Sequence, residues 1–148
     1  MEKPKFVYVT YIRTTPKQLW QALTEPEFTR KYWYSTWQEC DWKPGASWKI
    51  RTPNGEVADS GNVIEIEPER RLVLTWRSES QPELRAEGYS RLTYELEKVG
   101  DSVKLTVIHE VDKPGSKFLE SVSSGWPPVL ASLKSLLETG ESLAETRG

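Results

Sequence analysis

The sequence has little of the side-chain chemistry on which metalloproteins and many enzymes rely, because it contains one histidine, one cysteine and one methionine among 148 residues. The lone cysteine, Cys40, excludes an internal disulfide and fits a reducing compartment. One histidine and one cysteine cannot build a zinc cluster. Neither a glycine-rich phosphate-binding loop nor a GxSxG nucleophile elbow is present. We therefore expect no metal and no cofactor.

Long hydrophobic runs and an excess of one charge are also missing. No stretch approaches the roughly 20 apolar residues of a membrane span. The first residues, MEKPKFVYV, lack the basic-then-apolar layout of a secretory signal peptide. The net charge is −2, and basic residues are interleaved with acidic ones along the chain, which argues against a nucleic-acid binder. We expect a cytoplasmic protein with no membrane span and no nucleic-acid partner.

The length and composition are those of one globular domain. A chain of 148 residues is long enough to bury about two-thirds of its unfolded surface. Seven tryptophans and 28% charged residues distinguish it from a disordered chain. We expect residues 1–148 to form a single domain, in which residues 141–148 are a frayed tail.

The clearest element is a helix near the end of the chain, over residues 123–138. Ser124 is the predicted N-cap, so Pro127 and Pro128 fall in or just after the first turn, where a missing N–H costs little. Gly140 is expected to end the helix. The apolar residues fall on one stripe of a helical wheel, with an upstream continuation, and so predict one buried face. They are Leu119, Val122, Trp126, Val129, Leu130, Leu133, Leu136 and Leu137.

The beginning of the chain combines strand and helix signals. Residues 5–13 are apolar and aromatic on both parities, which predicts a strand buried along most of its length. Residues 15–18 read TPKQ, a capping box with proline at the first helical position, and predict a short helix that Pro26 ends. A second short helix is expected from Glu27 to about Trp33.

From residue 37 to residue 110 the hydrophobic period is two, which predicts about six antiparallel strands. The Asn54-Gly55 pair is typical of a hairpin turn. Residues 78–87 are polar, contain a proline and carry both charges, so we expect them to form the longest mobile loop. The order of elements is one strand, two short helices, a meander and one long helix.

This order predicts the α+β class. The C-terminal helix is the one element large enough to cover the apolar side of the strands. We therefore expect a curved antiparallel sheet of about six or seven strands wrapped around the long C-terminal helix, with two short helices after the first strand. A sheet curved around a helix is hard to fill along its whole length, and a gap between the two would be the place for a ligand.

Four stretches carry a family resemblance: TPKQLWQALTEPEFTRKYW, GNVIEIEPERRLVLTWR, SRLTYELEKVGDSVKLTVIHE and SGWPPVLASLKSLLETG. They resemble the successive signature blocks of the AHSA-type family, homologues of the activator of the heat-shock protein 90 ATPase. That family lies within the START-like superfamily, also called SRPBCC or Bet v 1-like, of polyketide cyclases and lipid-transfer proteins. The resemblance implies the helix-grip fold and a cavity between sheet and long helix. It implies less about chemistry, because binders, carriers, cyclases and chaperone partners share this scaffold.

The single histidine, His109, is the sharpest candidate for chemistry. It shares the strand parity of Leu105 and Val107, so it faces the helix if they do, where it could bind a ligand or move a proton. The alternative is a structural histidine, satisfied by a backbone carbonyl or by Tyr94. A nucleophile pair of Cys40 and His109 is disfavoured, because a lone cysteine is ordinarily buried as a small hydrophobe.

Parity and the helical wheel place a set of aromatic and apolar residues toward the inner space. Each tryptophan taken alone is more readily explained as core. Together, four inward tryptophans with a few polar groups favour an aromatic, mostly apolar pocket. The predicted ligand-binding residues are Trp33, Trp48, Trp76, Tyr94, His109, Trp126, Leu130 and Leu133.

Three hypotheses for function follow. The first is a START-like binding or carrier domain for a small hydrophobic molecule, without a catalytic set and gated by residues 78–87. The second rests on the family resemblance alone: a stress-associated or chaperone-associated interaction protein, with a chaperone or another protein as its partner. The third is a polyketide cyclase-like or hydrolase-like enzyme that uses His109 as acid or base, together with Tyr94. The sequence does not distinguish a monomer from a homodimer.

Overall fold

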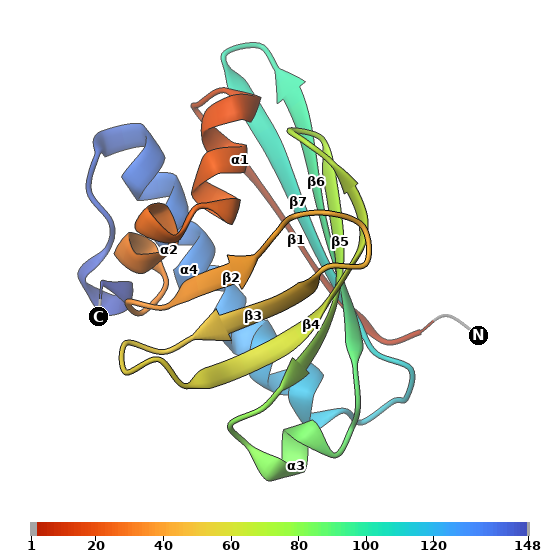
Figure 1. Cartoon of the computed structure of the whole chain (residues 1–148). Helices are drawn as coiled ribbons and strands as arrows, with labels where there is room; N and C mark the ends of the chain where they lie inside the picture. The colour runs from red at the N-terminus through yellow and green to blue at the C-terminus, as the bar shows by residue number, and fades with distance from the viewer. Residues whose placement is uncertain (1–2, 148) are drawn as a thin grey trace.

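An antiparallel sheet curves around the last helix (Figure 1). The structure is a computed structural model that describes residues 3–147. Across the sheet the strand order is β1-β7-β6-β5-β4-β3-β2. The strands are β1 (Lys5–Ile12), β2 (Trp37–Cys40), β3 (Ser47–Arg51), β4 (Val57–Glu67), β5 (Arg71–Ser78), β6 (Ser90–Val99) and β7 (Ser102–Glu110). The helices are α1 (Pro16–Thr24), α2 (Pro26–Tyr32), α3 (Pro82–Arg85), α4 (Lys117–Thr139) and the 3₁₀ helix η1 (Ala144–Thr146).

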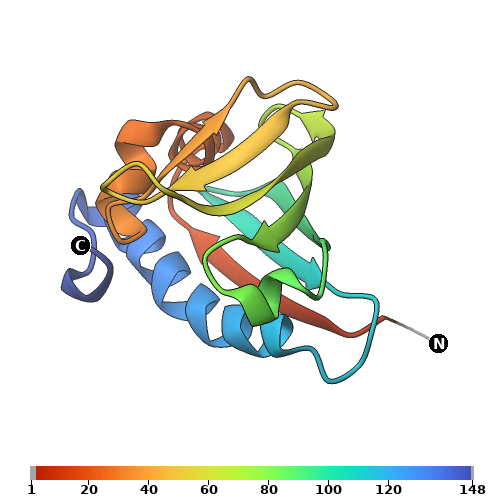
Figure 2. The same cartoon turned by 60° about the horizontal axis from the view of Figure 1, so that its bottom comes forward.

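The predicted architecture is confirmed. Figure 2 shows α4 lying along the concave side of the sheet, and α1 and α2 pack against it after β1. The core fills the space between α4 and the sheet. Leu130 and Leu133 from α4 and Leu105 and Val107 from β7 are all at most 1% exposed there.

Curvature arises where the pairing of β4 with its neighbours is interrupted. The register shifts between Ile50 and Arg51 on one side and between Val63 and Glu65 on the other, and such bulges bend and twist a strand. At Gly61 a Cβ atom would lie 1.8 Å from the carbonyl oxygen of Thr75 on β5. Only glycine permits this close approach of two backbones, which lets the sheet fold around α4.

β1 differs from its prediction. It is an edge strand, which among the strands of residues 3–147 pairs with β7 alone, and its burial alternates along the strand instead of being continuous. The aromatic and β-branched residues of both parities do not distinguish a strand buried on two faces from one buried on a single face. The C-terminal half of α4 covers part of this edge: Lys134 donates to the carbonyl oxygen of Tyr11, and Glu138 accepts from the N–H of Arg13 at 2.8 Å. The roughly half-exposed residues of β1 are Val7, Val9 and Tyr11.

α4 begins earlier than predicted. Its N-cap is Ser116, whose hydroxyl accepts from the N–H of Leu119 at 3.0 Å, so Ser124 is not the cap. Pro127 and Pro128 consequently lie inside the helix, where a proline costs about 3 kcal/mol. Burial of the long apolar face against the sheet offsets that cost. The prediction that Gly140 ends the helix is confirmed, since it adopts a left-handed conformation with φ of 87°.

Residues 78–87, predicted to be a mobile loop, contain α3 and are tied to α4. Leu84 of α3 is buried. The carboxylate of Glu87 accepts from the N–H groups of Lys117 and Phe118 at 3.0 and 3.2 Å, and it also contacts the hydroxyl of Ser116. A carboxylate at a helix N-terminus is stabilised by the helix dipole. This segment therefore serves as a cap for α4.

Residues 141–147 are also more ordered than the predicted frayed end, residues 141–148, whose last residue lies outside the described part of the chain. The N–H of Leu143 donates to the hydroxyl of Ser132 on α4 at 2.9 Å, and the carbonyl of Thr146 accepts from the N–H of Tyr34 at 2.7 Å. Ser132 is a buried hydroxyl on α4 and needs a partner, which the returning chain supplies. Within residues 3–147, none of the helices has the length and hydropathy of a membrane span.

Candidate functional site

A small pocket lies between α4 and the strands β4 and β5, with the end of α2 at its side. Its volume is about 180 Å³. We call it the tryptophan pocket, because three indole side chains line it, one from the end of α2, one from β5 and one from α4. Its lining residues are Trp33, Tyr34, Asp59, Trp76, Ser121, Val122, Gly125, Trp126 and Val129.

The three tryptophans pack against each other and form one continuous aromatic wall. The ring centroid of Trp33 lies 5.3 Å from that of Trp126 and 6.0 Å from that of Trp76, and Trp76 and Trp126 are 5.8 Å apart. Their planes are inclined by 32° to 68°, the tilted and edge-on arrangements that aromatic pairs prefer. Trp76 and Trp126 are each 4% exposed, whereas Trp33 is only partly buried, so Trp33 forms the outer part of this wall.

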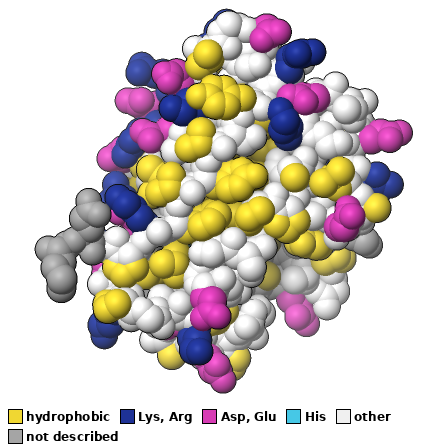
Figure 3. Space-filling model, turned by 180° about the vertical axis from the view of Figure 1, so that it is seen from behind, with side chains coloured by type: hydrophobic (Ala, Val, Ile, Leu, Met, Phe, Trp, Pro, Cys, Tyr) yellow, Lys and Arg dark blue, Asp and Glu magenta, His cyan; other side chains and the backbone are white. Residues whose placement is uncertain are grey.

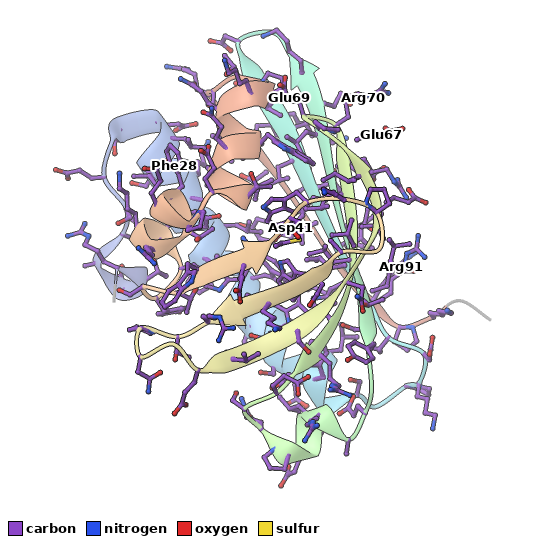
Figure 4. All side chains as sticks on the ribbon, viewed as in Figure 1. Phe28, Asp41, Glu67, Glu69, Arg70 and Arg91 are labelled. Atoms are coloured by element: carbon purple, nitrogen blue, oxygen red, sulfur yellow. The ribbon has the colours of Figure 1, made fainter. Side chains whose placement is uncertain are left out.

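Asp59 is the one ionisable acid in the lining. The indole N–H of Trp76 donates to its Oδ1 at 3.0 Å. Burial, partly offset by this hydrogen bond and reinforced by the nearby Glu79, raises the pKa of Asp59 to about 6. By contrast, Figure 4 shows Glu67, Arg70 and Arg91 on the side of the sheet that faces away from α4, where charged side chains are hydrated.

His109 lies behind the same tryptophans in a directional chain of hydrogen bonds. The indole N–H of Trp126 donates to Nδ1 of His109 at 3.2 Å, so Nδ1 is the acceptor and Nε2 carries the proton. Nε2 in turn lies 2.8 Å from Oγ of Ser90, whose hydroxyl donates to the carbonyl of Trp76 at 2.8 Å. Burial lowers the pKa of His109 to about 3. The ring is neutral and has no free lone pair, so it cannot act as a base without breaking the chain.

The structure separates the predicted ligand-binding residues into two groups. Trp33, Trp76 and Trp126 meet at the tryptophan pocket, whereas the other five lie in the core and do not line it. The structural interpretation of His109 is supported, although its partners are Ser90 and Trp126 and not Tyr94. The residues in the core are Trp48, Tyr94, His109, Leu130 and Leu133.

The contacts of two of these core residues, Trp48 and Tyr94, lie within the protein core. The indole N–H of Trp48 donates to the side-chain oxygen of Gln38 at 2.7 Å, and both residues are buried. Burial raises the pKa of Tyr94 well above its ordinary value, so it remains a neutral phenol whose ring meets Trp126 edge-on. Neither side chain is available to a ligand in the pocket.

Sequence reasoning missed Asp59. Its strand carries the bulge and Gly61, which disturb the period-two pattern that would have shown its orientation. A signal existed in Trp76, because a buried indole N–H needs an acceptor and β4 is the neighbouring strand.

Cys40 is also bonded to its own loop. Its sulfur accepts from the N–H of Trp42 at 3.2 Å, and burial raises the pKa of its thiol.

A larger hollow of about 400 Å³ lies on the other side of α3, between the segments 86–90 and 111–116. Two polar connections form most of its wall, and the N-terminus of α4 beneath it is already capped by Glu87. Ser90 reaches this hollow, but its hydroxyl is bonded to His109 and to the carbonyl of Trp76. The tryptophan pocket is therefore the better candidate for a binding site.

The sequence can be placed in a family. The model for "Activator of Hsp90 ATPase homolog 1-like protein", AHSA1, matches residues 13–138. The chain belongs to the AHSA1 family. The predicted membership is thus confirmed. A comparison of the AHSA1-family sequence with functionally curated proteins gives no match.

Solved structures similar to this AHSA1-family protein share its helix-grip fold. A protein from Mesorhizobium loti is 23% identical with a TM-score of 0.77, over 90% of this chain and 96% of that one. The Aha1 dimer from Colwellia psychrerythraea is 19% identical with a TM-score of 0.75, over 94% and 99%. An HSP90 activator from Plasmodium falciparum is 22% identical with a TM-score of 0.68, over 83% and 87%. At these identities the likeness shows the fold.

Proposed function

We propose that this protein is a binding or carrier domain for a small, mostly apolar molecule, which it holds in the tryptophan pocket. The observation that supports the proposal most strongly is the lining itself. Three packed indoles provide an apolar wall, and the polar groups are few: the carboxyl of Asp59 and the hydroxyls of Tyr34 and Ser121. Few convergent polar groups in an otherwise apolar pocket are typical of small-molecule sites.

The volume of the pocket restricts the ligand. About 180 Å³ corresponds to roughly six water volumes, which suits a molecule or a chemical group of about six to ten heavy atoms. A polyketide or a long acyl chain would extend beyond the pocket, which is open to solvent. Leu130 and Leu133, which were predicted to contact the ligand, are packed in the core.

The test begins with native mass spectrometry on gently purified protein, compared with the mass of the denatured chain. The proposal predicts an adduct of roughly 100 Da. Gly125 lines the pocket, and a Cβ atom there meets nothing within 4 Å, so Gly125→Leu should fill the space without a clash. The matched control is Ser124→Leu, which adds the same side chain to an exposed position one residue earlier. An adduct that survived in Gly125→Leu would contradict the proposal.

A protein-interaction role is the second candidate, and exposed apolar residues favour it. Val7, Val9 and Tyr11 on the edge strand β1 are 46% to 50% exposed. Figure 3 shows that hydrophobic side chains gather on the face opposite to the view of Figure 1. Exposed apolar patches mark interaction surfaces, and an unpaired strand edge can pair with another chain.

This second role is tested with purified components. An Hsp90-type chaperone should hydrolyse ATP faster when the protein is added, and a Val7→Lys, Val9→Lys double variant should lose the effect. The charge-for-apolar exchange at an edge is expected to leave the fold intact, which circular dichroism checks. An unchanged ATPase rate with the wild-type protein would count against this role.

The enzyme hypothesis has less support, because both ring nitrogens of His109 are already hydrogen-bonded within the protein.

A further inference from the structure

The carboxylate of Asp59 lacks a counter-ion. One of its oxygens accepts from Trp76, and within residues 3–147 no basic side-chain nitrogen lies within 4 Å of either oxygen. Arginines exist nearby but are committed elsewhere: Arg77 and Arg85 both bind Glu79, at 2.6 and 3.2 Å. Asp59 therefore has hydrogen-bonding and charge capacity left over on the side of the pocket.

This arrangement is costly unless something positive enters. Asp59 is partly buried, and a carboxylate without a counter-ion loses part of its hydration there, which a neutral ligand does not restore. With a pKa of about 6, Asp59 is still mostly ionised at neutral pH. An opposite charge in the pocket would restore the lost interaction, and the tryptophans beside Asp59 would reduce its screening by water relative to the open surface.

The rest of the lining suits the same kind of ligand. The face of an indole carries negative potential and attracts cations, more strongly than tyrosine or phenylalanine does. Three tryptophans and Tyr34 surround the pocket, and the alkyl groups around an organic ammonium centre also prefer apolar walls. A metal ion does not fit these contacts, because hard cations require several oxygen ligands and the lining offers few.

We propose that the tryptophan pocket binds a small organic cation, with its ammonium group against Asp59 and its carbon atoms against Trp33, Trp76 and Trp126. This inference rests on the proposed function, because it names the chemical class of the molecule that the pocket would hold. The site selects for charge and size together. A neutral molecule of the same shape lacks the contact with Asp59, and a bulkier cation exceeds about 180 Å³.

The test uses two probes of the same shape, choline chloride and its neutral carbon analogue 3,3-dimethyl-1-butanol. Binding to the full chain is followed by isothermal titration calorimetry and by tryptophan fluorescence, at constant ionic strength kept with sodium chloride. Choline should bind at least tenfold more tightly than the alcohol. Asp59→Asn, which keeps the shape and an acceptor for Trp76, should lower choline affinity at least tenfold and leave that of the alcohol unchanged.

Several outcomes would overturn the inference, and they separate it from the proposed function. Equal affinity of the wild-type protein for both probes would mean a neutral site, so the cation inference would fall while the binding role stood. Unchanged choline affinity in Asp59→Asn would have the same meaning. If neither probe bound, the cation inference would fail, and native mass spectrometry of the wild-type protein and Gly125→Leu would then decide the binding role separately. Thermal unfolding of each variant verifies that it is folded.

Discussion

His109 and Asp59 are titratable side chains beside the same tryptophan, Trp76, but His109 is fully buried and Asp59 only partly. Their hydrogen bonding differs as well. Both nitrogens of His109 are bonded within the protein, to Trp126 and Ser90. Asp59 has one bonded oxygen and lines a pocket with the rest of its carboxylate. A group whose bonding capacity is filled internally serves the fold. A group with capacity left over in a pocket is available to a ligand.

The largest expected effect on stability comes from removing His109 from its hydrogen bonds with Trp126 and Ser90. His109→Ala should lower the free energy of unfolding by about 3 to 5 kcal/mol, because it leaves a cavity and deprives the indole N–H of Trp126 of its acceptor. Denaturant unfolding at pH 7 measures the loss. Lys104→Ala, on the same strand but only partly buried, should change stability by less than about 1 kcal/mol. A loss below 1 kcal/mol in His109→Ala would show that the chain is not structural.

Replacing Asp59 should have the opposite effect and raise the free energy of unfolding. The folded-state pKa of Asp59, about 6, lies above its ordinary value of about 3.9, so the charged form destabilises the folded protein above pH 6. Asp59→Asn should therefore be about 2 kcal/mol more stable than wild type at pH 7. As the pH falls to 4, the folded wild-type protein takes up its proton and the difference should shrink to below 1 kcal/mol. Urea unfolding of the wild-type protein and Asp59→Asn between pH 4 and pH 7 measures this difference in stability. A difference that did not change with pH would contradict the interpretation.

The stability that neutral His109 contributes to the folded protein should decrease in acid. Its folded-state pKa, about 3, lies below the ordinary 6.5, so the unfolded chain binds a proton first as the pH falls. The stability from this group is complete above about pH 7 and declines by about 2 kcal/mol on going to pH 5. His109→Gln lacks the titration, so the stability gap between it and the wild-type protein should narrow by that amount. An unchanged gap would mean that His109 is not held neutral.

The smallest effect concerns the wall opposite Asp59. Gly125 lies inside α4, where glycine costs about 0.5 to 1 kcal/mol relative to alanine, and a Cβ atom meets nothing within 4 Å. Gly125→Ala should thus raise the thermal unfolding temperature by a few degrees. It should also reduce the space of the pocket. Stabilisation with weaker ligand binding would indicate that the glycine keeps the pocket open at the expense of the helix.

Much of the fold followed from periodicity, and the exceptions have physical causes. The meander, the two short helices and the apolar face of α4 depend on local spacing, which the sequence displays directly. The start of α4 was placed too late because two prolines were assumed to mark a first turn, whereas tertiary burial tolerates them inside the helix. β1 was expected to be buried because its composition carries no information about which strand occupies an edge.

The candidate site was only half predictable for a related reason. Tryptophans attract notice in a sequence, and three of the four proposed as pocket residues do line the pocket. Asp59 is one of 22 acidic residues, and nothing in its neighbourhood along the chain sets it apart. Its role depends on the pairing of β4 with β5 and on the position of Trp76, which are long-range features. His109 was singled out because it shares the inward parity of Leu105 and Val107, and the structure places its ring in a hydrogen-bond chain with Trp126 and Ser90.

Pro127 and Pro128 interrupt the backbone hydrogen bonds of α4 in the middle of the helix. Because neither proline has an N–H, the hydrogen-bond ladder is broken where the helix passes the pocket. The first half is anchored by Glu87 and the second by the contacts of Lys134 and Glu138 with β1. Protection of amide hydrogens from exchange should therefore differ between the two halves of α4, and hydrogen exchange measures that difference.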